Sequence, residues 1–144
     1  GRKTVRDGGA TAKVLIAKIA QTEKDLAASG TADAQAVLKQ LSAGRVAFEE
    51  VVAYILANAK TDTKAVYAGS VAYLRLCGLV LGAWQLARAL LAAQRLRDSD
   101  PGFYDAKIAT ARFFAENLLP QAQALAISIV ESGHSTNALE VEQF

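Results

Sequence analysis

The fold is decided by residues 71–93, which read VAYLRLCGLVLGAWQLARALLAA. Apolar side chains point in nearly every direction around a helix built from this stretch, and Arg75, Gln85 and Arg88 are its only strongly polar interruptions. Its uncharged run, residues 76–87, is shorter than the roughly 20 residues that a membrane span needs. The stretch therefore predicts the central helix of a soluble core and no membrane span.

Three other stretches show helical periodicity, at residues 10–29, 31–59 and 101–131, and the central helix is expected to extend over residues 64–97. The 30 alanines and 17 leucines favour helix, and no alternating run favours a strand. Short turns join the four segments, so that neighbours run antiparallel. The sequence predicts an all-α fold, an up-down-up-down four-helix bundle with a long central third helix.

Capping residues set the expected ends of these helices. Gly30 is a candidate left-handed cap for the first helix, and Thr31 is a candidate N-cap for the second. Before the last helix, the expected N-cap is Ser99 or Asp100, because Pro101 suits the first helical position.

Two interior residues disturb the periodic pattern. Gly44 lies inside the second helix, where glycine costs about 1 kcal/mol relative to alanine. Pro120 lies inside the last helix and predicts a kink near Asn117 rather than an end.

The composition excludes several classes of protein. The chain has 144 residues, 52% of them hydrophobic, which fits one domain with a sizeable core. One cysteine allows no internal disulfide, and one histidine allows no paired-histidine metal site. A net charge of +2 gives no electrostatic argument for a nucleic-acid partner.

The inventory of catalytic residues is small. Cys77 lies in the most apolar helix, where burial would raise the pKa of its thiol, so a structural cysteine is favoured over a nucleophile. His134 follows the last helix, and a solvated tail residue is the favoured interpretation. No glycine-rich phosphate loop is present. We therefore expect no catalytic, cofactor-binding or metal-ligating residue in this chain.

Small residues form one candidate structural or interface feature on the third helix. Gly78, Gly82, Ala89 and Ala93 fall within about 60° of arc at 100° per residue. Such a stripe lets another helix approach closely. Packing inside the bundle is favoured, and a subunit interface is the alternative.

Arg75 is the second candidate, because a guanidinium in an apolar stretch cannot be buried unpaired without a cost of several kcal/mol. An internal pair with Glu49, Glu50 or Glu116 is the favoured interpretation. The alternative is that Arg75 reaches a partner surface outside this chain.

Two segments resemble a known family. They read YLRLCGLVLGAW at residues 73–84 and FYDAKIATARFFAE at residues 103–116. Both are similar to the C-terminal helical domain of bacterial acyl-CoA dehydrogenases, in the subgroup of 3-methylmercaptopropionyl-CoA dehydrogenases and related long-chain mycobacterial enzymes. The opening GRKTVRDGG also resembles the stretch that closes the preceding dehydrogenase domain, and the ending ALEVEQF resembles a natural C-terminus.

The resemblance implies a domain organisation. Residues 1–9 would end the preceding dehydrogenase domain, residues 10–133 would form the four-helix domain, and residues 134–144 would be a flexible tail. The chain has no initiator methionine and no apolar signal region, which favours a piece of a longer polypeptide. The family's catalytic glutamate, in a Tyr-Glu-Gly-Thr type motif, would then precede residue 1.

The resemblance also implies an activity and partners for the parent protein. It would be a cytoplasmic FAD enzyme that oxidises an acyl-CoA to the 2,3-enoyl-CoA, passing electrons to an electron-transfer flavoprotein. The domain would pack on its own catalytic domain or complete a subunit interface in a homo-oligomer. The alternative is a stand-alone helical protein-interaction module that binds a partner helix. A free-standing enzyme ranks third, because the chain offers no set of acid, base and nucleophile.

Overall fold

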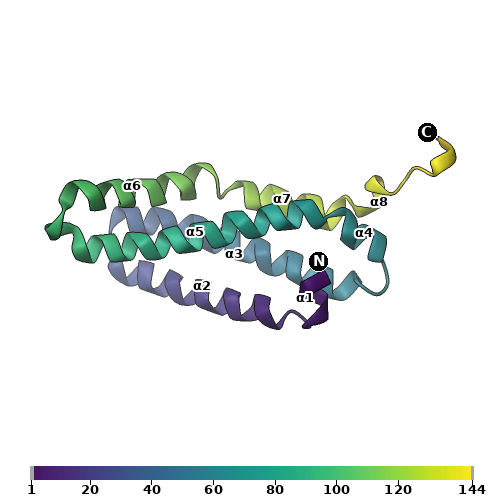
Figure 1. The fold of residues 1–144 in the computed structure, drawn as a ribbon, viewed down its shortest axis with the longest axis horizontal. Coiled ribbons are helices and arrows are strands. Elements are labelled where there is room, and N and C mark those ends of the chain that lie inside the picture. The colour runs from purple at the N-terminus through teal and green to yellow at the C-terminus, as the bar shows by residue number, and fades with distance from the viewer. Residues whose placement is uncertain (1, 144) are drawn as a thin grey trace.

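The computed structural model describes residues 2–143 and consists, over that range, of helices without strands. Gly1 and Phe144 lie outside the described residues. They are the first residue of the expected segment 1–9 and the last residue of the expected tail 134–144. The long helices are α2 (Ala10–Ser29), α3 (Ala32–Asn58), α5 (Ser70–Leu96) and α6 (Pro101–Asn117), and α7 (Gln121–Glu131) continues the direction of α6. Figure 1 shows that successive long helices run in opposite directions along the bundle, which confirms the all-α, up-down-up-down arrangement.

Short elements complete the described chain. The helix α1 (Arg2–Arg6) precedes α2, α4 (Thr63–Ala68) precedes α5, and the 3-10 turn η1 (Arg97–Ser99) follows α5. The helix α8 (Gly133–Thr136) and the 3-10 turn η2 (Val141–Gln143) lie in the C-terminal segment, which projects from the end of the bundle (Figure 1). The flexibility of residues 134–144 stays a prediction.

The caps confirm the expected turns. Gly30 has φ 67° and donates its N–H to the carbonyl of Leu26, while the Thr31 hydroxyl accepts from the N–H of Ala34 at 3.2 Å. Of the two candidates before Pro101, Asp100 is the N-cap, and its carboxylate accepts from the N–H of Phe103 at 3.1 Å.

The last two helices are separated by a break, which corrects the predicted kink. Over residues 118–120 the regular pattern is lost, and the N–H of Leu119 bonds to the carbonyl of Phe114 at 3.0 Å, one residue beyond the helical partner. Pro120 has no N–H with which to continue the helix. The break presents Leu119 to α3, where a Cβ added at Gly44 would lie 2.9 Å from Leu119 Cδ1. Gly44 therefore allows α3 to lie close to the break.

The third predicted helix is also interrupted, at Gly69 between α4 and α5. A Cβ at Gly69 would lie 3.0 Å from Cγ2 of Ile129 on α7, so the chain turns here against a buried side chain. The short α4 packs on α8, where a Cβ at Gly133 would lie 2.6 Å from that of Ala65.

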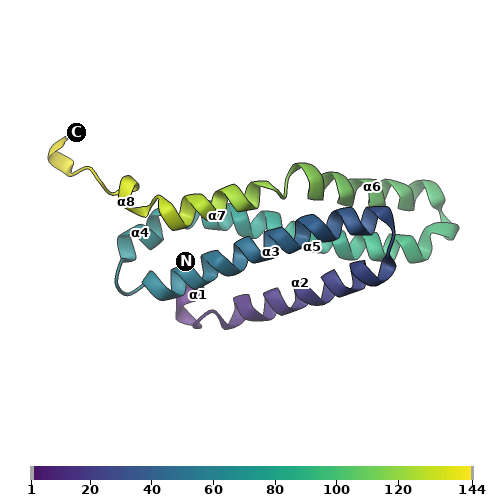
Figure 2. The ribbon, with the colours of Figure 1, turned by 180° about the vertical axis from the view of Figure 1, so that it is seen from behind.

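The central stretch occupies the position that its composition predicts. The helix α5 contacts α2, α3, α6 and α7, and its Leu76, Val80 and Leu90 are fully buried. Seen from behind (Figure 2), α3 lies between α2 and α7. Within the described residues, α5 with the turn that follows is the one helix long and apolar enough to cross a membrane. A core helix meets the same requirement, and α5 packs on four others.

Candidate functional site

Arg75 does not form the predicted ion pair with a carboxylate. Its side chain is exposed, and its Nη2 donates to Oε1 of Gln121 on α7 at 2.7 Å. The prediction assumed that Arg75 is buried, but its side chain lies where the surface of α5 meets α7. Water and a neutral amide therefore solvate this guanidinium.

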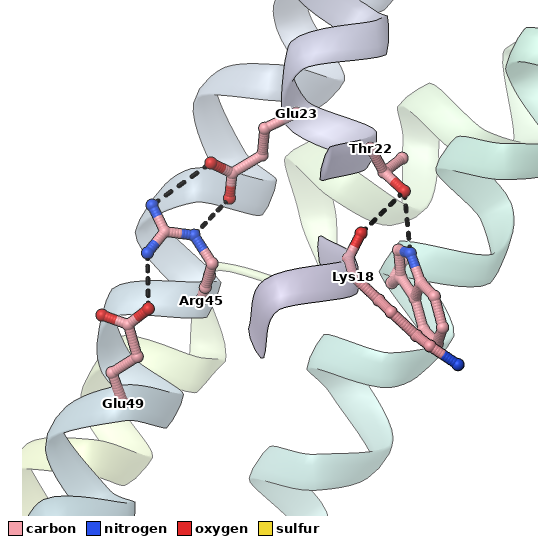
Figure 3. Close-up of polar contacts among 6 residues, drawn as sticks. Lys18, Thr22, Glu23, Arg45 and Glu49 are labelled. Atoms are coloured by element: carbon pink, nitrogen blue, oxygen red, sulfur yellow. Dashed lines mark hydrogen bonds and ion pairs between the residues drawn. The ribbon is translucent and has the colours of Figure 1, made fainter. Parts of the chain in front are cut away.

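The predicted carboxylate partners have other positions. Glu49 accepts from Nη1 of Arg45 at 2.6 Å, and Nε of Arg45 donates to Glu23 on α2 at 2.7 Å (Figure 3). These two carboxylates, Glu23 first, raise the pKa of Arg45. The network ties α2 to α3 and is half-buried.

Glu116 also pairs with a different arginine. It accepts from Nε of Arg112 at 3.0 Å, and Nη1 of Arg112 donates to Asp33 on α3 at 3.0 Å. Hydrogen bonds from Asp33 and then Glu116 raise the pKa of Arg112. Glu50 is exposed and forms no ion pair within residues 2–143. The structure therefore brings none of these carboxylates to Arg75.

The small residues of α5 do not form one packed face, which corrects the favoured interpretation of that stripe. A Cβ at Gly78 would have no atom within 4 Å, and Ala89 is exposed. Gly82 lies at the edge, where its Cβ would contact Phe114 at 3.5 Å, and Ala93 is buried. The four residues lie across the boundary between the core and the surface of the bundle. Only Gly82 and Ala93 therefore pack inside it.

The first half of α5 exposes an apolar surface instead. Val71 is 82% exposed and Leu74 is 74% exposed. Gly78 and the half-buried Leu81 follow them at helical spacing. We call these four residues the α5 face. Sequence reasoning expected surplus apolar area on this helix to face a partner, but it did not identify these four residues, although their spacing was available.

A cavity of about 260 Å³ lies beside this face, between α1, α2 and α5. Tyr73 bonds to the hydroxyl of Thr4 at 3.1 Å, which fixes α1 against the first half of α5. Cys77 lines the same cavity and is half-buried rather than fully buried. Burial raises the pKa of the Cys77 thiol and raises that of Tyr73 to about 12. The raised thiol pKa agrees with a structural cysteine.

A buried polar contact lies further along the same seam between α2 and α5. The Trp84 indole Nε1 donates to the hydroxyl of Thr22 at 2.9 Å, and that hydroxyl donates to the carbonyl of Lys18 at 3.2 Å (Figure 3). Periodicity alone gave no signal for this pair, because the two residues are 62 positions apart.

The described residues do not fit the flavin that the resemblance implies for the parent protein. A flavin site aims hydrogen-bonding groups at the ring nitrogens. Within residues 2–143, every buried side-chain nitrogen and oxygen already has a partner in the protein. His134, the single histidine, is exposed on α8. The candidate functional sites within the described residues are therefore surfaces.

The comparisons with known proteins agree with this geometry. A family model described as acetyl-CoA dehydrogenase C-terminal like matches residues 15–140, which include most of the bundle. The chain is 40% identical over 137 residues to the 3-methylmercaptopropionyl-CoA dehydrogenase of Ruegeria pomeroyi. That match covers 94% of this chain and 23% of the relative's length. The chain thus belongs to the acetyl-CoA dehydrogenase C-terminal-like family.

Proposed function

We propose that this chain is the non-catalytic C-terminal domain of an FAD-dependent acyl-CoA dehydrogenase, in which it packs against the catalytic part of the same polypeptide. The parent enzyme would oxidise an acyl-CoA thioester to the 2,3-enoyl-CoA. Family membership supports the parent activity. The name of the Ruegeria pomeroyi relative supports an acyl-CoA thioester as the substrate class.

The α5 face is the observation that carries the packing proposal. Val71 and Leu74 are the most exposed large apolar side chains within the bundle helices, and contiguous exposed apolar surface marks interaction sites. The helix α1 lies at the end of the bundle where α5 begins (Figure 1). Its Thr4 is bonded to Tyr73 in the first half of α5, beside the α5 face. A domain joined through α1 would therefore meet the first half of α5.

The proposal includes the finer partners that the family resemblance implies. The parent enzyme would be a cytoplasmic homo-oligomer that passes electrons to an electron-transfer flavoprotein. The flavin and the catalytic glutamate would belong to the preceding part of the polypeptide, since the described residues do not fit a flavin.

Side-chain footprinting with hydroxyl radicals tests the packing. We expect Val71 and Leu74 to be labelled less in the full-length polypeptide than in the 144-residue chain, because the catalytic part covers them. Phe113 on α6, 59% exposed and outside the α5 face, is the control and should be labelled equally in both. Equal labelling of Val71 and Leu74 in the two proteins would exclude packing through this face.

A further inference from the structure

A second surface lies between α3 and α7. The two helices form an open groove of about 480 Å³, whose floor consists of small side chains such as Ala43, Ala47 and Ala126. A large apolar side chain is exposed on each rim, Val46 at 53% on α3 and Ile127 at 57% on α7. We call this surface the α3–α7 groove. Its surface is mostly apolar, and nothing in residues 2–143 covers it.

Two opposite charges line the groove along α3. Lys39 and Glu50 are both exposed and lie eleven residues apart, which corresponds to three helical turns and about 16 Å. Neither side chain forms an ion pair within residues 2–143, although Glu23, Asp33, Glu49 and Glu116 all do. The groove therefore has an unpaired cation, Lys39, at one end of its α3 wall and an unpaired anion, Glu50, at the other end.

This pattern of charge is complementary to itself. If a second α3 lay antiparallel in the groove, centred between residues 44 and 45, Lys39 of each copy would face Glu50 of the other. Val46 would face Ala43 in the same register, and alanines would meet alanines at the outer turns, Ala36 with Ala53 and Ala32 with Ala57. A two-fold axis thus satisfies both charges and places no bulky pair in the contact.

We propose that the α3–α7 groove is a two-fold symmetric interface for a second copy of this chain. The charge complementarity favours a second copy over an unrelated helix, because the second copy supplies both opposite charges at the required spacing. The paired helices would cover Val46 and bring Ile127 of each copy against the other α3. Such a contact is small, so we expect association that depends on protein concentration.

This interface is independent of the packing proposed for the α5 face. The helices α3 and α5 contact each other in the core, and each turns its exposed side away from the other. One surface can therefore bind while the other is free. A failure of the packing proposed for the α5 face would therefore leave the α3–α7 groove interface testable, and the reverse also holds.

Charge reversal followed by sedimentation equilibrium tests the proposal on the 144-residue chain. Lys39→Glu places two carboxylates opposite each other twice in the dimer, and Glu50→Lys places two ammonium groups together twice. We expect each single variant to raise the dimer dissociation constant about tenfold or more. The double variant restores both opposite-charge pairs and should return the constant to within about threefold of the original.

Two controls separate this interface from other effects. Lys18→Glu makes the same charge change on the side of α2 that faces α5, and it should leave the dissociation constant unchanged. Leu74→Asp disrupts the α5 face and should also leave it unchanged. All altered side chains are exposed, so circular dichroism should show the same helical content for every variant.

Three results would overturn the proposal. The first is a chain that stays monomeric up to about 1 mM, which would leave less than about 4 kcal/mol for association. The second is a dimer that single reversals do not weaken. The third is a double variant as weak as the single ones, because only facing charges can be rescued by exchange.

Discussion

At the scale of single residues, the polar contacts separate into those that order the bundle and those that water can replace. The Arg45 network and the Thr22–Trp84 bond join helices in half-buried or buried surroundings. The pair of Arg97 with Asp105 is exposed, and such pairs contribute little because solvent screens them. Sequence reasoning expected the important arginine to be Arg75, yet two carboxylates bind Arg112 and two bind the half-buried Arg45. Its partner Glu23 belongs to another helix, so periodicity could not identify it.

Thr22→Val should destabilise the chain. The change keeps the shape of the side chain but leaves the buried Trp84 N–H without an acceptor, at a cost of about 1–3 kcal/mol. The free energy of unfolding in urea measures the effect. Thr110→Val is the matched control, because the Thr110 hydroxyl also donates to a carbonyl four residues back but is exposed, and it should change stability by less than about 0.5 kcal/mol. Equal effects of the two changes would contradict a role for the Thr22–Trp84 bond.

At the scale of helices, the boundaries that depend on caps were predictable and the interruptions were not. Gly30, Thr31 and Asp100 act through neighbouring backbone groups, which a local sequence pattern describes. The breaks at Gly69 and at residues 118–120 bring the chain against Ile129 and Gly44, which are distant in sequence. Pro120 signalled a disturbance, but its extent depends on where Leu119 packs.

Two glycines in helix interiors should respond oppositely to alanine. Gly78→Ala should raise the free energy of unfolding by about 1 kcal/mol, because alanine favours helix and the added methyl group meets no atom. Gly44→Ala should lower it, since the methyl group would lie 2.9 Å from Leu119 and overpacking costs about 1–3 kcal/mol. Thermal and urea unfolding of the two variants measure the difference. A stabilised Gly44→Ala chain would show that Leu119 moves away freely.

At the scale of the whole molecule, the bundle has one core, but two of its surfaces remain uncovered. The α5 face and the α3–α7 groove lie on opposite sides, so the domain can bridge two neighbours. The sequence predicted an excess of apolar residues in the central helix and an interface as one use for it. It did not predict the groove, whose walls come from two helices far apart in the chain.

The 144-residue chain should neither bind FAD stoichiometrically nor reduce a dye with an acyl-CoA. The reason is that every buried side-chain nitrogen and oxygen within residues 2–143 already has a partner, and that the family resemblance places the catalytic glutamate before residue 1. Absorption spectra after dialysis against FAD, together with a dye-reduction assay, measure both properties. The full-length polypeptide is the positive control. A purified chain with a flavin absorption band would contradict the expectation.

The sequence by itself determined the four helical segments, their order and their antiparallel arrangement, because periodicity, caps and turn lengths are local properties. It also carried the family resemblance, in two segments that the family match includes. Only the tertiary structure decided which sides of α5 and α3 stay exposed, where Arg75 finds its partner and how Gly44 admits Leu119. These outcomes depend on contacts between residues far apart in the chain, and such contacts leave no periodic signal in the sequence.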